Sequence, residues 1–134
     1  MGTHESDLQA LHRIHDDWIV YYNTGNVEAL LALYDAESVI MPRGRQRISG
    51  VDAVRSYFER LYARGRLTMQ SRLEKLEING SWAIQYGLFT IRIQPHDGGP
   101  EEGDAGRYFI LLRKHADGRW TVYQDLDQHT QDAL

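Results

Sequence analysis

The segment Trp82–Gln94, with the sequence WAIQYGLFTIRIQ, limits the possible folds more than any other part of this 134-residue chain. Its residues alternate as they do in a β-strand, where successive side chains point to opposite faces of a sheet. One face carries Trp82, Ile84, Tyr86 and Leu88, and the other carries Ala83, Gln85, Gly87, Phe89 and Ile91. Because both faces are largely apolar, we expect one to cover a core or cavity and the other to contact a second copy of the chain. Gly87 is expected at a bend or bulge.

Three further segments complete a predicted antiparallel meander with this strand. Leu67–Ile78 precedes it across Asn79-Gly80, a strong hairpin signal, and Arg107–Lys114 and Arg119–Asp127 follow, joined by a turn that contains Asp117-Gly118. The stretch between them, Pro95–Gly106, is rich in glycine and acidic residues and is expected to be an exposed loop.

The part of the chain before Gly65 predicts helices, because its apolar residues recur every three or four positions. The helices are expected at Asp7–Tyr22, Val27–Tyr34 and from Ser49 to Gly65, with Ser6 or Asp7, Asn26 and Ser49 as the respective N-caps. A short strand, Ser38–Met41, and a polar turn, Arg43–Arg47, indicate a small hairpin that ends near Ile48. No βαβ alternation is present, so the pattern favours an α+β fold with helices on one face of the sheet.

Composition excludes several classes of protein. The chain has 15 basic and 19 acidic residues, whereas a nucleic-acid-binding domain usually carries a basic face. No apolar run approaches the roughly 18 residues that span a membrane, and the N-terminus lacks a signal-peptide pattern, so we expect a cytoplasmic protein. The absence of cysteine rules out disulfides and thiolate metal sites. The length fits one domain, residues 1–134.

Two segments, Trp18–Leu61 and Asp117–Gln128, resemble the nuclear transport factor 2-like superfamily and, within it, the SnoaL-like and ketosteroid-isomerase-like group. The resemblance implies a cone: a curved antiparallel or mixed sheet wraps around three N-terminal helices, and the open end admits a small molecule. Members commonly form homodimers through the outer face of the sheet. The superfamily includes isomerases, cyclases, hydrolases and dehydratases as well as binding domains without activity, so it implies no single reaction.

Met41 departs from the steroid-isomerase pattern, in which a carboxylate general base precedes the proline that ends the first short strand. Here Met41 precedes Pro42, and a thioether cannot accept a proton. The sequence therefore argues against ketosteroid isomerase activity through this residue, and Met41 is expected to be a flexible lining of the pocket.

The last predicted strand, Arg119–Asp127, offers two alternatives for the polar side chain that faces the cavity, Gln124 and Asp125. Regular alternation groups Trp120 and Val122 with Gln124, which predicts Gln124 inside and Asp125 outside. A β-bulge would reverse this order and make Asp125 the natural acid or base. Tyr22, which continues the apolar stripe of the first helix, is a second candidate catalytic group, since its hydroxyl could donate to a ligand carbonyl, although a core tyrosine is the simpler interpretation.

The predicted ligand is a small apolar molecule, and no cofactor is expected. The candidate ligand-binding residues are Trp18, Tyr22, Met41, Tyr57, Phe58, Tyr86 and Gln124. His12, His15 and Asp16 lie close together on the first helix, but they lack a third aligned ligand, so no metal site is predicted. Arg43, Arg45 and Arg47 either bind an anion at the mouth or form a solvated turn. No phosphate loop, zinc motif or Ser-His-Asp arrangement is recognisable.

Two functional hypotheses follow. One is a cofactor-free enzyme that performs acid–base isomerisation, cyclisation or hydration. The other is a ligand-binding or dimeric interaction module of the same fold without turnover.

Overall fold

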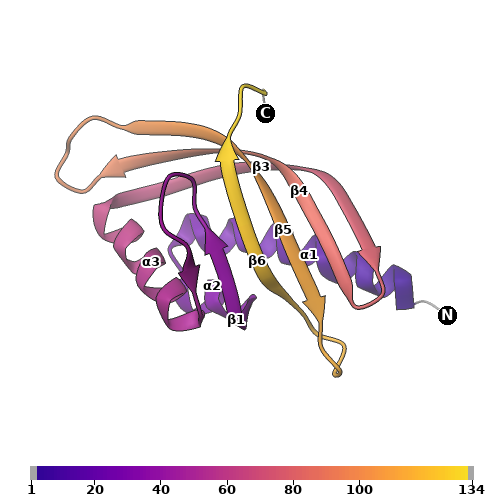
Figure 1. Ribbon diagram of the computed structural model, residues 1–134. Coiled ribbons are helices and arrows are strands. Elements are labelled where there is room, and N and C mark those ends of the chain that lie inside the picture. The colour runs from indigo at the N-terminus through magenta and orange to yellow at the C-terminus, as the bar shows by residue number, and fades with distance from the viewer. Residues whose placement is uncertain (1–2, 133–134) are drawn as a thin grey trace.

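The computed structural model describes residues 3–132 and shows a curved, open, six-stranded sheet arching over the helices (Figure 1). The strand order is β2-β1-β6-β5-β4-β3; the β1–β6 pair is parallel and the other pairs are antiparallel. This arrangement confirms the predicted α+β cone with a mixed sheet. The elements are α1 (Thr3–Thr24), α2 (Val27–Ala32), β1 (Tyr34–Met41), β2 (Ile48–Ser49), α3 (Val51–Arg64), β3 (Gly65–Asn79), β4 (Trp82–Pro95), β5 (Glu102–Lys114) and β6 (Trp120–His129).

The helix starts agree only partly with the predicted caps. The Asn26 side chain does cap α2, accepting a hydrogen bond from Ala29 N at 3.1 Å. By contrast, α1 already begins at Thr3, and Asp7 lies within it. The residue before α3 is Gly50, with φ 88° and no side-chain cap, because Ser49 belongs to β2 and pairs with Val39. Although α1 has 22 residues, neither it nor another described helix is both long and apolar enough to cross a membrane.

Two predicted boundaries are wrong because strand pairing overrides the local pattern. Tyr34 opens β1 instead of ending α2, since it pairs with Val122 of β6. The predicted loop Pro95–Gly106 is strand from Glu102 onward, where β5 pairs with Ile93 and its neighbours in β4. Backbone pairing along a neighbouring strand thus orders a segment whose glycines and acidic residues are typical of a loop.

A buried charged cluster joins β1 to the hairpin between β5 and β6. Asp35 is 2% exposed and accepts hydrogen bonds from Arg113 Nε at 2.7 Å and Arg113 Nη2 at 2.9 Å. It also accepts one from the Thr121 hydroxyl at 2.9 Å. Burial opposes ionisation of Asp35, but these bonds and the one from Glu37 N outweigh it and hold its pKa well below the ordinary value.

A second buried carboxylate ties α1 to β6. Asp7 is 8% exposed and accepts a hydrogen bond from Trp120 Nε1 at 2.9 Å. Lys114 Nζ lies 3.0 Å from the same carboxylate. The bond from Trp120 is the largest influence on Asp7 and keeps its pKa below the ordinary value, against the opposing effect of burial.

The side chain of Asn23 docks α1 on the free edge of the sheet. Its amide donates to Met69 O at 3.0 Å and its carbonyl accepts from Met69 N at 2.7 Å. Since β3 is an edge strand, this pair of bonds satisfies backbone groups that no neighbouring strand reaches.

The two faces of β4 divide as the alternation predicts. Ala83 and Gln85 on the inner face are buried, whereas Trp82 and Tyr86 on the outer face are 41% and 39% exposed. Gly87 itself pairs regularly with Tyr108, and the bulge lies opposite it in β3, between Leu73 and Lys75.

Gly87 is required because two groups approach its backbone closely. A Cβ at this position would lie 2.1 Å from the Arg72 carbonyl oxygen and 2.8 Å from the Tyr108 hydroxyl. We therefore expect Gly87→Ala to lower the free energy of unfolding by about 1–3 kcal/mol, the usual cost of overpacking, as measured by urea denaturation.

Gly103→Ala is the matched control in the adjacent strand, because a Cβ there meets nothing nearer than the Ile91 carbonyl oxygen at 3.7 Å. It should change stability little. Equal losses in both variants would show that strand glycine alone, and not the close approach, explains the effect.

Candidate active site

A cavity of about 200 Å³ lies between the helices and the inner face of the sheet. Most of its lining is apolar, and α1, α3, β1 and the strands from β3 to β6 all contribute to it. Five of the predicted site residues line it: Trp18, Tyr22, Tyr57, Phe58 and Asp125. The cavity therefore places one candidate acid among aromatic side chains.

A β-bulge in β6 decides which residues of this strand face the cavity. Leu112 pairs with Val122 and Leu111 pairs with Gln124, so Tyr123 is an extra residue on β6. The alternation therefore shifts after Val122, and Asp125 and Asp127 line the cavity. The bulged alternative is thus correct for Asp125.

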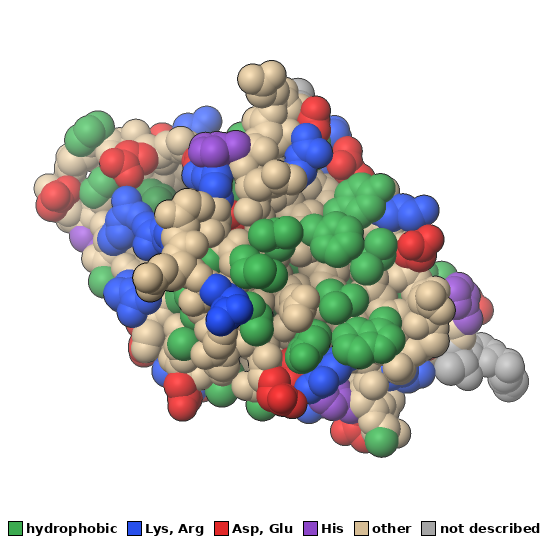
Figure 2. Space-filling model, in the orientation of Figure 1, with side chains coloured by type: hydrophobic (Ala, Val, Ile, Leu, Met, Phe, Trp, Pro, Cys, Tyr) green, Lys and Arg blue, Asp and Glu red, His purple; other side chains and the backbone are tan. Residues whose placement is uncertain are grey.

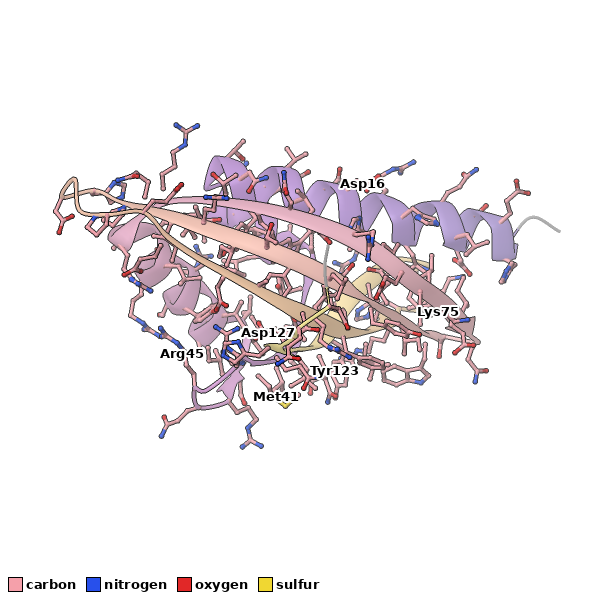
Figure 3. All side chains as sticks on the ribbon, turned by 90° about the horizontal axis from the view of Figure 1, so that it is seen from above. Asp16, Met41, Arg45, Lys75, Tyr123 and Asp127 are labelled. Carbon is pink, nitrogen blue, oxygen red and sulfur yellow. The ribbon has the colours of Figure 1, made fainter. Side chains whose placement is uncertain are left out.

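Three predicted ligand-binding residues are absent from the cavity lining: Met41, Tyr86 and Gln124. The bulge turns Gln124 away from the cavity, and Tyr86 lies on the exposed outer face of β4. Met41 projects away from α1, on the same side as Tyr123 (Figure 3). Its neighbours Ile40 and Pro42 line the cavity instead, because alternate residues of a strand point to opposite faces.

Asp125 ends a short chain of hydrogen bonds that begins on α1. Trp18 Nε1 donates to the Tyr34 hydroxyl at 3.0 Å, and the Tyr34 hydroxyl donates to Asp125 Oδ2 at 3.1 Å. Indole N–H is only a donor, so it directs the Tyr34 proton toward the carboxylate. This chain fixes the orientation of one Asp125 oxygen and leaves the other for a molecule in the cavity.

The environment of Asp125 suits proton transfer near neutral pH. Loss of hydration is the main cause that raises its pKa to about 7, the negative charge of Asp127 adds to it, and the bond from Tyr34 acts in the opposite direction. A general acid or base is most effective when its pKa lies near the working pH.

Two tyrosines in the lining stay protonated at neutral pH. Burial raises the pKa of Tyr57 to about 12, with Asp127 and Asp125 contributing, and burial raises the pKa of Tyr22 well above its ordinary value. Both phenols are therefore available as hydrogen-bond donors. Tyr22 also stacks on Trp18 with ring centroids 4.8 Å apart, so it has a packing role as well.

The mouth of the cavity carries charges of both signs. Arg43 N donates to Asp127 Oδ1 at 2.9 Å, and the Arg43 guanidinium forms an ion pair with Asp104 of β5. The exposed Arg45 also contributes to the lining, and Figure 3 shows it at the same end of the molecule as Asp127. The predicted arginine turn thus borders the cavity, with Arg43 engaged by carboxylates.

A second polar group lies elsewhere in the lining. His15 Nε2 is 2.9 Å from Ser71 Oγ, and Tyr108 Oη is 3.4 Å from the same oxygen. His15 Nδ1 is 3.0 Å from Asp16 Oδ1. No Ser-His-Asp arrangement is recognisable in the sequence, because Ser71 is 56 positions away from His15 and no local motif connects them.

The sequence predicts no metal site at His12, His15 and Asp16 of α1. Within residues 3–132, no group of three or more histidine, aspartate or glutamate side chains is placed to hold a metal ion. The neighbours of His15 are instead a carboxylate and a hydroxyl, as described above.

Comparison with known proteins identifies the family. The SnoaL-like domain family matches residues 15–123, most of the chain, and the protein belongs to this family. A comparison with curated proteins gave no match.

Solved structures share the fold at low sequence identity. A ketosteroid isomerase-like protein from Erwinia carotovora atroseptica aligns with TM-score 0.81 and 18% identity, over 90% of this chain and 94% of the other. A candidate scytalone dehydratase from Novosphingobium aromaticivorans has TM-score 0.81 and 17% identity, over 96% and 87%. A nuclear transport factor 2-like superfamily protein from Salmonella enterica has TM-score 0.82 and 11% identity, over 94% and 92%. The fold is therefore nuclear transport factor 2-like, as the resemblance implied.

The raised pKa of Asp125 predicts a pH-dependent contribution to stability. Below about pH 4, the group is protonated in both the folded and the unfolded chain. As the pH rises toward 7, the unfolded chain loses this proton while the folded protein retains it, so folding becomes less favourable. We expect the difference in unfolding free energy, Asp125→Asn minus wild type, to increase between pH 4 and pH 7 and then to level off.

Chemical denaturation at a series of pH values measures this difference. Asp52→Asn, on the exposed side of α3, is the control that removes a carboxylate outside the cavity. A difference for Asp125→Asn that is constant across this range would contradict the raised pKa.

Proposed function

We propose that the protein is a cofactor-free acid–base enzyme that binds a small, largely apolar carbonyl compound in the cavity. The observation that carries this proposal is a carboxyl group with a pKa of about 7, oriented by Tyr34 inside an apolar, aromatic lining. Asp125 takes a proton from a carbon next to the carbonyl group and returns it at another position, which is the proton movement of an isomerisation, cyclisation or dehydration.

The neighbouring side chains supply the remaining requirements of this chemistry. Aromatic faces of Trp18, Tyr22 and Phe58 hold an apolar ring, and the protonated hydroxyl of Tyr22 or Tyr57 donates to the oxygen that gains charge when the proton leaves. The exclusion of water that raises the pKa of Asp125 also strengthens these hydrogen bonds. Met41 takes no part, since its side chain lies outside the cavity lining.

Proton exchange on a model ketone tests the proposal without knowledge of the natural substrate. We expect the protein to accelerate replacement of the α-protons of 2-tetralone by deuterium in D₂O, measured by proton NMR. Asp125→Asn should reduce the rate at least about 100-fold, the usual contribution of a general base. Tyr34→Phe should retain exchange but shift its pH profile upward, because the bond from Tyr34 lowers the pKa of Asp125.

Met41→Leu is the control and should leave the exchange rate nearly unchanged. Stabilisation by 2-tetralone in a thermal-shift assay, with exchange no faster than in buffer, would contradict enzymatic proton transfer. That outcome would favour the ligand-binding module instead.

We also propose that the protein forms a homodimer through the outer face of the sheet. Four large apolar side chains on this face are exposed, and Figure 2 shows an apolar patch there: Trp82, Tyr86, Phe109 and Leu126. The rings of Tyr86 and Phe109 stack with centroids 6.1 Å apart, so the aromatic side chains of the patch are adjacent. Contiguous exposed apolar surface of this kind is typical of an interface.

Phe109→Arg should convert a dimer into a monomer, as measured by size-exclusion chromatography with light scattering, because it places a charge at the centre of the patch. Val20→Arg on α1, where the valine is 56% exposed, is the matched control and should not change the mass. A wild-type protein that remains a monomer at high concentration would contradict the proposed dimer.

A further inference from the structure

A hydrogen-bonded group in the cavity lining, the Ser71–His15–Asp16 group, resembles a nucleophile with its base and an orienting carboxylate. His15 bonds to the Ser71 hydroxyl on one side and to the Asp16 carboxylate on the other. The two bonds of the histidine use different ring nitrogens: Nε2 is 2.9 Å from Ser71 Oγ, and Nδ1 is 3.0 Å from Asp16 Oδ1. Such a group is recognised by geometry and by the role of each atom, whatever the order of the residues in the chain.

The proton positions follow from the donors and acceptors. An ionised carboxylate only accepts hydrogen bonds, so Asp16 selects the tautomer of His15 with the proton on Nδ1. In the neutral ring, Nε2 then carries the lone pair and accepts the hydroxyl proton of Ser71. This is the arrangement in which a histidine can take the proton of an attacking serine.

The position of the group gives it access to the cavity. Both His15 and Ser71 belong to the lining, and the His15 side chain is only 16% exposed, whereas Asp16 is 77% exposed on the solvent side of α1 (Figure 3). A molecule bound in the cavity can therefore reach the Ser71 hydroxyl while the histidine stays shielded from bulk water.

The Tyr108 hydroxyl is a further polar group near Ser71 Oγ. It lies 3.4 Å away, within reach of the Ser71 hydroxyl as an acceptor, and it reaches this point across Gly87, which has no side chain to block it. When the Ser71 proton is directed to His15 instead, the Tyr108 hydroxyl can donate its own proton in this region, where a donor can stabilise an oxyanion.

We propose that Ser71 is an acyl-transfer nucleophile activated by His15, and that the cavity hydrolyses esters of small apolar or aromatic carboxylic acids. This activity is separate from the proton transfer proposed for Asp125, and neither requires the other.

The reaction balances without an added reagent other than water. Ser71 Oγ forms a bond to the acyl carbon while its proton passes to His15 Nε2. The ester C–O bond breaks, and the leaving alcohol takes the proton from His15. Water then attacks the acyl group on Ser71, giving one proton to His15, and the released Ser71 oxygen recovers that proton as the carboxylic acid departs.

Covalent labelling tests the proposal directly. A fluorophosphonate bonds to activated serines with loss of fluoride, so intact-mass and peptide mass spectrometry should locate one label on Ser71. Ser71→Ala should abolish this label, and His15→Ala should slow it at least about 100-fold. Ser81→Ala, in the exposed turn between β3 and β4, is the matched control and should be labelled like wild type. Circular dichroism confirms that each variant is folded.

A cysteine in place of the serine gives an independent measurement. The chain contains no cysteine, so Ser71→Cys introduces the only thiol. Its alkylation by iodoacetamide at pH 7 should be about 10-fold faster than that of Ser81→Cys, because a neighbouring histidine favours the thiolate. Adding His15→Ala should remove this advantage, whereas Asp16→Asn should slow it by about 10-fold or less, since Asp16 is largely exposed to solvent.

The proposal is overturned if folded wild type carries no label on Ser71 and the thiol of Ser71→Cys is alkylated no faster than the thiol of Ser81→Cys. It is also overturned if His15→Ala slows deuterium exchange on 2-tetralone while Ser71 stays unlabelled in wild type, because His15 would then serve proton transfer alone. Fluorophosphonate labelling and thiol alkylation both measure the reactivity of the side chain at position 71. A negative result in these experiments is therefore distinguishable from a failure of Asp125 to catalyse deuterium exchange.

Discussion

The single extra residue in β6 is the constraint on which the rest of the cavity depends. Up to Val122, the strand contributes side chains to the hydrophobic core, and after Tyr123 the same inner face carries carboxylates. Without the bulge, Asp125 would point to the outer face and an amide and a leucine would occupy the cavity wall. One backbone irregularity therefore changes an apolar core into a site with an acid in it.

Two aspartates of the sheet show how surroundings assign different roles to the same side chain. Asp35 is buried against Arg113 and the Thr121 hydroxyl, and its charge is stabilised. Asp125 has a phenol and a second carboxylate as neighbours, while the Arg43 guanidinium pairs with Asp104 and the Arg43 backbone N–H donates to Asp127. Burial with a cation makes a structural link, and burial without one leaves an acid that titrates near neutral pH.

Local patterns predicted the features that depend on local chemistry. Asn26 was identified as a helix cap, Asn79-Gly80 as a hairpin, and the two faces of β4 from simple alternation. The exceptions depend on partners distant in the chain. Tyr34 and Glu102 lie in strands because of pairing with β6 and β4, and no residue near Tyr123 marks the bulge.

The candidate site was predictable to a similar extent. The helix stripe placed Trp18 and Tyr22 in the cavity, and Asp125 was foreseen only as the bulged alternative. The contact between His15 and Ser71 joins a helix to an edge strand across 56 positions, and periodicity within either element carries no information about such a contact. Conversely, Gln124 and Met41 are predicted to line the cavity but do not. The prediction for Gln124 rests on regular alternation along the last strand, and the prediction for Met41 rests on its position before Pro42.

The bonds between Asn23 and Met69 have a consequence for self-association. An edge strand of 15 residues presents backbone groups that another chain could extend into a fibril. The Asn23 amide imitates a short piece of strand and occupies one such position from within the molecule. Addition of a further strand at this position of the edge is thereby obstructed, so the edge is a poorer template for growth of the sheet.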